Sequence, residues 1–564
     1  MQKTGILYLI IVISISFDVF GQTLSLHISG NNPYETKVLD SLDYRKKHEN
    51  YVSIQNEIDL IQKTLFNIGY IENHIYPLKK NNDSTFSTQI SLKTKYKAIH
   101  IYYERSQIDI KLLNSVSEKV FENYFIIDFI QLESTLNFIN SKMIEKGFPF
   151  TKLKLSNIEI ESRHNLKAYL NIETTNRKRN ISKIIIKGYE KFPHSFLKYY
   201  LKIKPNQLFN LNEIKTKTKG LNNLRFASEI KPPEVLFSKD STTLYVYLQK
   251  TASNTFDGFL GFGTNEDTNN LQFDGYLNLS LINNLNYGES FKLNYKSDEN
   301  DQKTFETNLS LPYLLKSPIG IDLALRIFKQ DSSFSTVNQS VKAHYQINTK
   351  HKIYSGILST QSNNLLNENT STTIFDYNTR YFSLGYQFLK NQNYNSLFPI
   401  NTSILFETNI GTRYQTDQQE NQSLMSFDGY KILNLDNKNS FYLRLNVANL
   451  NSKTYFENEL LRFGGINSIR GFEENSIYAT LFGLINTEYR YQLNNTLYIH
   501  SISDLGFFEN ELQNTEERLY TFGFGFGILT KTGLLKFNFA NGKNENNSFK
   551  LANSKIHLSL IANF

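Results

Sequence analysis

The chain has 564 residues, which is too long for one ordinary core and predicts several domains. It contains no cysteine, and this excludes disulfides, thiol catalysis and cysteine-ligated metals. The formal net charge of +8 is spread along the chain instead of forming one basic block, so we expect no nucleic-acid partner.

Residues 1–22 have the features of a signal peptide. Lys3 supplies the positive start, and a mostly apolar run from Gly5 to Phe20 follows it. Gly21 offers a small residue at a cleavage point. The run is too short and too weakly flanked for a convincing membrane span, although Asp18 leaves a signal anchor as an alternative. We therefore expect an exported chain.

Residues 24–250 carry a threefold repeat. The dipeptides that begin at Gly69, Gly147 and Arg225 each end in an aromatic residue and stand 78 residues apart. An amphipathic stretch with a period near 3.6 precedes each of them, and short alternating segments follow. The repeat therefore predicts a unit of one strand, two helices and two strands, with coincidence as the alternative. The expected domains are residues 24–95, 96–176 and 180–250.

The third repeat is the clearest of the three. Its first strand begins at Ile181 and closes on Gly188, where a turn with positive φ fits. A helix is expected from about Leu211, and closing strands lie near Val235 and Leu244. This order resembles a POTRA domain, the polypeptide-transport-associated module. A small sheet with an uncovered edge can accept an extended segment through main-chain hydrogen bonds, which do not depend on sequence.

From residue 255 to residue 564 the period of the sequence changes to two. Leu277, Leu279 and Leu281 alternate with polar residues, and the last segment, Ile556–Phe564, is apolar on one face. Such alternation is typical of a transmembrane barrel with apolar residues outside, although a soluble sandwich also alternates. The expected fold class is α+β POTRA repeats followed by an all-β transmembrane barrel of about 16 antiparallel strands.

One arginine and two acids are predicted to meet inside this barrel. Arg470 lies in a long irregular stretch late in the barrel region, and strand parity points Glu488 and Asp504 inward from adjacent strands. Two inward carboxylates can hold one planar guanidinium, and Gly471 permits a tight turn behind it. The alternatives are a solvated Arg470 and acids that only line the pore.

The run Ser468-Ile469-Arg470-Gly471-Phe472 resembles the loop motif of the outer-membrane assembly-factor superfamily, the BamA/TamA-like proteins with a surface-antigen-type barrel. Asp504-Leu505-Gly506 is similar to the D-x-G of its next barrel motif, although Ile502 stands where an aromatic residue is usual. Glu488 falls where the family keeps an acidic partner. The resemblance implies that the loop folds into the lumen, where Arg470 meets Glu488 and Asp504 beside Gly506. Three repeats and sixteen strands are closest in layout to TamA.

The resemblance also implies an assembly or translocation factor. The POTRA domains would receive unfolded outer-membrane or secreted polypeptides, which the barrel would insert or translocate through a weak seam between its first and last strands. Glycine weakens a strand, and the seam is expected at Gly258, Gly261, Gly263 and Phe564. The expected location is the outer membrane of a diderm bacterium, with the POTRA domains in the periplasm and a possible TamB-like, inner-membrane-anchored partner.

Two other interpretations stay open. A two-partner secretion transporter would export one dedicated protein through the barrel lumen, and Val38–His48 is a possible plug helix for it. A passive porin-like channel would need neither the repeats nor the loop arginine. An enzyme is not expected, because the motifs G-x-S-x-G and H-E-x-x-H are absent, and neither a cofactor nor a metal is expected.

Overall fold

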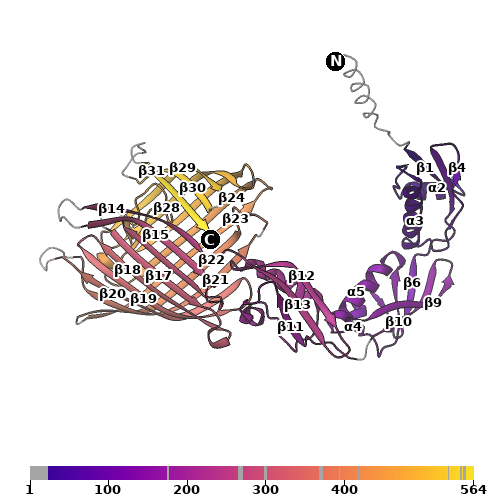
Figure 1. Ribbon diagram of the computed structural model, residues 1–564, viewed down its shortest axis with the longest axis horizontal. Coiled ribbons are helices and arrows are strands. Elements are labelled where there is room, and N and C mark those ends of the chain that lie inside the picture. The colour runs from indigo at the N-terminus through magenta and orange to yellow at the C-terminus, as the bar shows by residue number, and fades with distance from the viewer. Residues whose placement is uncertain are drawn as a thin grey trace, which may run out of the picture. The chain divides into compact units, whose positions relative to one another are not determined.

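This computed structural model describes residues 23–174, 177–264, 271–297, 302–366, 373–392, 394–416, 418–530, 533–545, 549 and 554–563. The predicted signal peptide and Phe564 lie outside the described residues. The chain forms two compact units. One holds the first two repeats, and the other holds the third repeat together with the barrel (Figure 1).

The first domain is a sheet with two helices. Its elements are β1 (Leu24–Gly30), α2 (Pro33–Asp40), β2 (Lys47–His48), α3 (Tyr51–Asn67), β3 (His74–Ile75), β4 (Lys79–Lys80) and β5 (Thr85–Ser91). The side chains of Asn32 and Asn50 cap the two helices by accepting a backbone N–H of the first turn. Ile54, Ile61 and Leu65 share one face of α3 and are buried in the domain core.

The segment Val38–His48 belongs to this domain. Leu39 and Tyr44 are buried in its core, and Val38 and Leu42 pack against them. The segment considered as a plug helix is therefore built into the first domain, and α2 ends at Asp40.

The second domain repeats the plan with one addition. Its elements are β6 (Ala98–Tyr102), α4 (Ile110–Asn114), β7 (Lys119–Val120), β8 (Tyr124–Asp128), η1 (Phe129–Gln131), α5 (Leu132–Glu145), β9 (Lys152–Ser162) and β10 (Asn165–Glu173). The hairpin β7–β8 extends the sheet beyond β6 and is absent from the predicted unit. The strand β9 forms the opposite edge.

The third domain has the predicted order of elements. They are β11 (Lys183–Lys187), η2 (Phe196–Tyr200), α6 (Leu211–Thr218), η3 (Lys219–Asn223), β12 (Ala227–Phe237) and β13 (Thr242–Lys250). The residue after β11, Gly188, has φ +89°, as the sequence predicts. In all three domains the first strand pairs in parallel with the last, namely β1 with β5, β6 with β10 and β11 with β13. This shared pairing makes the three segments copies of one unit.

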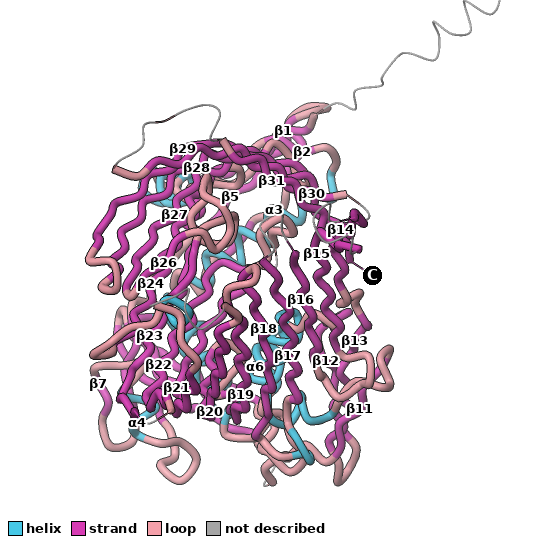
Figure 2. The backbone as a smooth tube through the Cα atoms, turned by 90° about the vertical axis from the view of Figure 1, so that its left-hand side faces the viewer, coloured by secondary structure: helices cyan, strands magenta, loops and turns pink. Residues whose placement is uncertain are grey.

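Sixteen strands close into a barrel (Figure 1, Figure 2). They are β14 (Thr255–Thr264), β15 (Leu271–Ile282), β16 (Ser290–Ser297), β17 (Gln302–Leu311), β18 (Ile319–Gln330), β19 (Phe334–Gln346), β20 (His351–Asn364), β21 (Tyr377–Asn391), β22 (Ile400–Gln415), β23 (Gln418–Asn434), β24 (Asn439–Asn451), β27 (Leu481–Gln492), β28 (Leu497–Asn510), β29 (Thr515–Leu529), β30 (Gly533–Lys543) and β31 (Lys555–Asn563). Each strand pairs with the next in the chain, except that β24 pairs with β27 across a two-stranded hairpin, β25 (Leu461–Phe463) and β26 (Ile477–Ala479).

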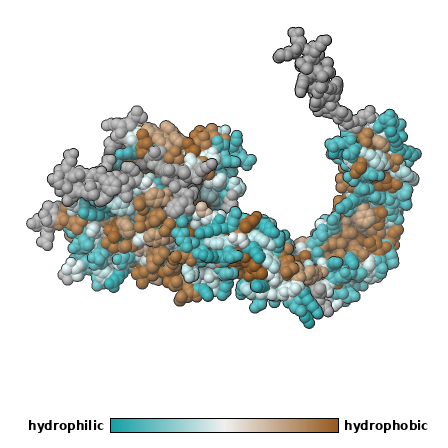
Figure 3. Space-filling model, in the orientation of Figure 1, coloured by the Kyte–Doolittle hydropathy of each residue, from teal (hydrophilic) through white to brown (hydrophobic). Residues whose placement is uncertain are grey.

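The two faces of the barrel wall differ in polarity. On adjacent strands, Ile357, Phe382 and Ile410 are 60%, 54% and 60% exposed, whereas Ser383 and Asn409 are buried and hydrogen-bonded to each other. Apolar residues gather on the outer surface of the barrel in Figure 3. The predicted fold class, with polar residues inside and apolar residues outside, is confirmed. Within the described residues, no helix is long and apolar enough to cross a membrane.

Aromatic side chains fix the third domain to the barrel turns. Phe196 and Tyr199 contact the ring of Tyr313 in the β17–β18 turn, with ring centroids 5.0 and 5.5 Å away. The hydroxyl of Tyr189 accepts a hydrogen bond from Asn283 Nδ2 at 2.7 Å. Burial raises the pKa of Tyr200 to about 12, so its hydroxyl stays protonated and donates to the carbonyl of Thr349 at 3.3 Å. These contacts explain why the third domain and the barrel form one unit.

The segment between β13 and β14 is hydrogen-bonded at both ends. The backbone N–H of Thr251 donates to the carbonyl of Phe226 in the third domain at 3.2 Å. The hydroxyl of Ser253 donates to the carbonyl of Ile282 at the end of β15 at 3.0 Å, and the N–H of Ile282 donates to Asn254 Oδ1 at 3.0 Å. The connection is therefore part of the folded structure along its length.

Candidate functional site: the lumen loop and the seam

The chain between β24 and β27, residues 452–480, is called the lumen loop here. It packs against the inner face of the barrel through a cluster of buried apolar side chains around Ile469, which has no exposed surface. The cluster joins loop residues to the strands β24, β27, β28 and β29 and contains Ala448, Phe463, Ile469, Ala479, Phe482, Leu484, Phe508 and Leu519. This burial holds the loop motif against one wall of the barrel.

Arg470 lies at the centre of the motif and contacts both predicted acids. Its Nε and Nη2 donate to the two carboxylate oxygens of Asp504 at 2.8 and 2.5 Å, and its Nη1 donates to Glu488 Oε1. Its backbone N–H also donates to Asp504 Oδ2 at 3.1 Å. Arg470 is 6% exposed and Asp504 is fully buried, so the carboxylate of Asp504 depends on Arg470 for charge compensation, and the charge of Arg470 is compensated by the two acids.

Glu488 is shared between two arginines. Its Oε2 accepts a hydrogen bond from Nε of Arg490 at 2.7 Å and lies 2.7 Å from Nη2 of the same guanidinium. The guanidinium of Arg490 lies over the rings of Tyr442 and Phe398, at 4.2 and 4.6 Å from their centroids. Asp504 differs, because among the described residues its carboxylate accepts hydrogen bonds from Arg470 alone.

The other motif residues shape the turn that presents Arg470. Gly471 has φ +83°, and a Cβ on it would lie 2.5 Å from the backbone nitrogen of Gly542 on β30. The hydroxyl oxygen of Ser468 accepts the backbone N–H groups of Gly464 and Ile469 at 2.7 and 2.6 Å. A Cβ on Gly506 would lie 3.0 Å from the side chain of Ile469, so glycine there makes room for the motif. Phe472 packs at the edge of the apolar cluster.

A second anchor of the lumen loop was not predicted. Arg413 on β22 donates to Glu459 of the loop and, at 2.7 Å, to Glu420 on β23, and it is 3% exposed. The Glu420 carboxylate also accepts the backbone N–H of Thr454 at 2.8 Å. Further along, Arg462 donates to Gln330 Oε1 at 2.9 Å and lies over three aromatic rings. The loop is thus fixed to strands on two separate stretches of the wall.

Among the described residues, the junction of the first and last strands has the fewest residue pairs of the neighbouring strands in the barrel wall. Within the described residues, β14 and β31 pair only at Thr255 with Asn563 and at Phe256 with Ala562. By contrast, β14 shares ten residue pairs with β15, and β31 shares eight with β30. The predicted seam glycines, Gly258, Gly261 and Gly263, all lie on the part of β14 beyond these two pairs.

Comparison with known proteins agrees with this architecture. The POTRA family model, described as "Surface antigen variable number repeat", matches residues 180–250. The chain is a POTRA-barrel protein. No curated protein matches it.

Solved structures of similar fold include CdiB from Acinetobacter baumannii, with a TM-score of 0.53, 13% identity and coverage of 91% of this chain and 98% of that one. CdiB from Escherichia coli gives a TM-score of 0.53 and 13% identity, covering 90% of this chain and 98% of that one. BamA from Haemophilus ducreyi lacking POTRA domains 1–3 gives a TM-score of 0.49 and 14% identity, covering 82% and 99%. The resemblance of this POTRA-barrel protein to the assembly-factor superfamily is confirmed by its POTRA domain and its fold. The particular likeness to TamA stays a prediction.

Proposed function

We propose that this POTRA-barrel protein lies in the outer membrane of a diderm bacterium, with its POTRA domains in the periplasm. There it receives unfolded polypeptides and inserts or translocates them through the β14–β31 seam. The chemistry required of it is non-covalent, because the client's own folding and apolar burial supply the driving free energy. A TamB-like partner anchored in the inner membrane would belong to the same pathway and is part of this proposal.

The observation that carries the proposal is the weakness of the seam. Two neighbouring antiparallel pairs contain about two hydrogen bonds, so opening the seam costs about 1–3 kcal/mol of net free energy. The ten pairs between β14 and β15 correspond to about 5–15 kcal/mol by the same reasoning. Thermal motion can therefore open the β14–β31 seam, whereas it cannot open the junction between β14 and β15. An opened strand presents free N–H and C=O groups that can pair with a client strand.

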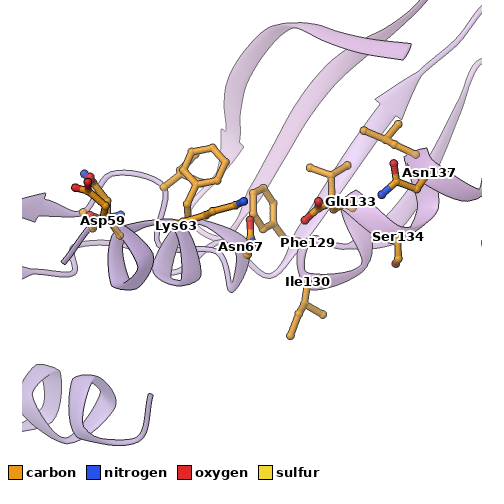
Figure 4. Close-up of a pocket in the computed structure, with 14 residues that line it drawn as sticks. Asp59, Lys63, Asn67, Phe129, Ile130, Glu133, Ser134 and Asn137 are labelled. Atoms are coloured by element: carbon orange, nitrogen blue, oxygen red, sulfur yellow. The ribbon is translucent and has the colours of Figure 1, made fainter. Parts of the chain in front are cut away.

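A cleft in the first unit supports the capture of unfolded chains. It lies between α3 of the first domain and the η1–α5 segment of the second and has a volume of about 1030 Å³ (Figure 4). Phe66 and Ile130 line it and are 51% and 67% exposed, and Lys63 and Glu133 contribute charges to the same cleft. An exposed apolar surface with a polar surround is typical of sites for transient protein contact.

The sheet edges of the POTRA domains differ in their capacity to pair. The edge strand β12 of the third domain contains Pro232 and Pro233, which have no N–H group to donate to an added strand. The edge strand β9 of the second domain has no proline, and Ile158 and Ile160 on it are 54% and 60% exposed. We therefore assign client pairing to β9.

The alternative of secretion through the lumen has less support. The lumen loop occupies the interior along two stretches of wall, and the segment considered as a plug is part of the first domain. A chain passing through the lumen would have to pass the loop that both anchors hold there, whereas opening the seam requires about two backbone hydrogen bonds to break.

A disulfide across the seam tests the proposal, because the chain has no cysteine of its own. T255C/N563C places cysteines at paired positions, whose spacing across a strand pair suits a disulfide. A343C/S355C, at paired positions of β19 and β20, is the matched control. In liposomes, the oxidised seam variant should fail to insert a urea-denatured small outer-membrane barrel, and reduction should restore insertion. Normal insertion by the oxidised seam variant would refute the seam route.

A further inference from the structure

Two glutamates directly after the loop motif contact strands on both sides of the seam. Glu473 Oε1 lies 3.0 Å from Nζ of Lys555, the first residue of β31. Glu474 Oε2 lies 3.3 Å from Nζ of Lys296 on β16. The strand order is β31, β14, β15, β16, so the two ion pairs span the seam and the first two strands of the barrel from inside.

Gly464 and Gly465 shape the loop around these glutamates. Both have positive φ, +120° and +89°. A Cβ on Gly464 would overlap the carbonyl oxygen of Glu473, and a Cβ on Gly465 would overlap the carboxylate of Glu474. The two glycines therefore make room for the backbone of Glu473 and the side chain of Glu474. Neither glycine contacts Arg470 in the hydrogen bonds described above.

The ion pairs lie where the seam lacks backbone pairing. The two residue pairs of the seam are at the start of β14 and the end of β31, beside the third domain. Lys555 is at the other end of β31, and among the described residues β14 and β31 do not pair there. At that end of the seam, among the described residues, β31 is thus connected to the strands β14–β16 through the contacts of Glu473 and Glu474.

We propose that Glu473 and Glu474 form an electrostatic strap that holds the seam closed in the resting protein and releases when the seam opens. This proposal rests on the proposed function only where it links opening of the seam to insertion of a client. All four side chains are between a quarter and three-fifths exposed, so each ion pair is individually weak and screened by salt. A restraint of this strength suits a junction that must open repeatedly.

Charge reversal tests the strap on the full chain in lipid vesicles. E473K/E474K replaces both attractions by repulsions from Lys555 and Lys296. We expect amide hydrogen exchange in residues 255–264 and 555–563 to become about tenfold faster, since these strands open more often. The complete swap, E473K/E474K with K296E/K555E, should return the exchange rates to those of the parent chain.

A second ion pair in the barrel provides the matched control. Lys342 on β19 bonds Glu407 on β22 at 2.7 Å and also spans two strands, β20 and β21, far from the seam in strand order. E407K breaks that pair and should leave exchange in the two seam strands unchanged. High ionic strength should speed exchange in the seam strands of the parent chain and have little effect on those of the charge-reversed variant.

Each result decides one question. Unchanged exchange in E473K/E474K, or faster exchange that the complete swap does not reverse, would overturn the strap. Faster exchange that the swap reverses supports it, whatever the insertion assay gives. If E473K/E474K and oxidised T255C/N563C then insert the denatured barrel protein equally well, the strap is supported and the seam route of the proposed function is refuted.

Discussion

Arg470→Ala removes the side chain that, in the described part of the chain, compensates the buried carboxylate of Asp504. Three of the four hydrogen bonds made by Arg470 to the acids come from its guanidinium, and the variant keeps only the backbone N–H. Glu488 retains its hydrogen bond and ion pair with Arg490. The effect of the substitution is therefore concentrated on Asp504, which has no exposed surface.

Removal of one partner from a buried ion pair typically destabilises by about 3–5 kcal/mol, because a charge is left uncompensated. The loop can relieve this by leaving the wall, so the loss should appear as local opening of residues 464–472. At about 1.4 kcal/mol per factor of ten, the open population should rise by roughly a hundredfold to several thousandfold. In the double variant R470A/D504N the charge is gone, and an unpaired neutral amide costs only about 1–3 kcal/mol.

Hydrogen exchange of the loop in lipid vesicles measures this opening directly, and urea unfolding reports on the barrel as a whole. We expect R470A to lose most loop protection while the barrel remains inserted, and R470A/D504N to regain part of it. Loop protection in R470A equal to that of the parent, or a further loss on adding D504N, would refute the argument that an uncompensated Asp504 drives the change.

Three further predictions follow from the same structure. Gly471→Ala should open the loop although every charge remains, because φ +83° and the approach to Gly542 exclude a Cβ; Gly483→Ala, whose Cβ would meet only Val447 at 4.0 Å, should leave loop exchange unchanged. Phe196→Ala should lower the free energy that holds the third domain on the barrel turns by about 3–5 kcal/mol. Limited proteolysis should then cleave within residues 181–250, and a third domain as resistant as that of the parent chain would contradict the prediction. Deletion of residues 24–175 should leave an inserted barrel with weak insertion activity, and deletion of 180–250 should weaken it further; full activity of a chain starting at Thr255 would exclude a working role for the POTRA domains.

Strand parity explains why part of the site was predictable. Because side chains alternate across a strand, the positions of Glu488 and Asp504 in their segments were enough to turn both inward, and the loop motif supplied Arg470. The structure places these three in contact. The barrel and the third domain were predictable for the same reason, since period and turn residues are local properties of the sequence.

Other parts of the site depend on contacts that no local pattern encodes. Arg413 meets Glu459 from 46 positions away, and nothing in the alternation of β22 separates it from other inward polar residues. No sequence pattern distinguishes Lys296 and Lys555, the lysines of the strap, from other lysines on the barrel strands. The hairpin β7–β8 was missed because a strand of two residues carries no period.

The hydrogen-bonded segment between β13 and β14 has a mechanical consequence. Thr251 is tied to the third domain and Ser253 and Asn254 to the end of β15, so the connection has no slack to absorb displacement. The two seam pairs begin one residue later, at Thr255. A pull on the third domain is therefore transmitted to the end of β15 through Ser253 and Asn254, one residue before the seam pairs begin. The start of β14 is thus held next to an anchored connection, and displacement of the third domain relative to the barrel would have to break these hydrogen bonds first.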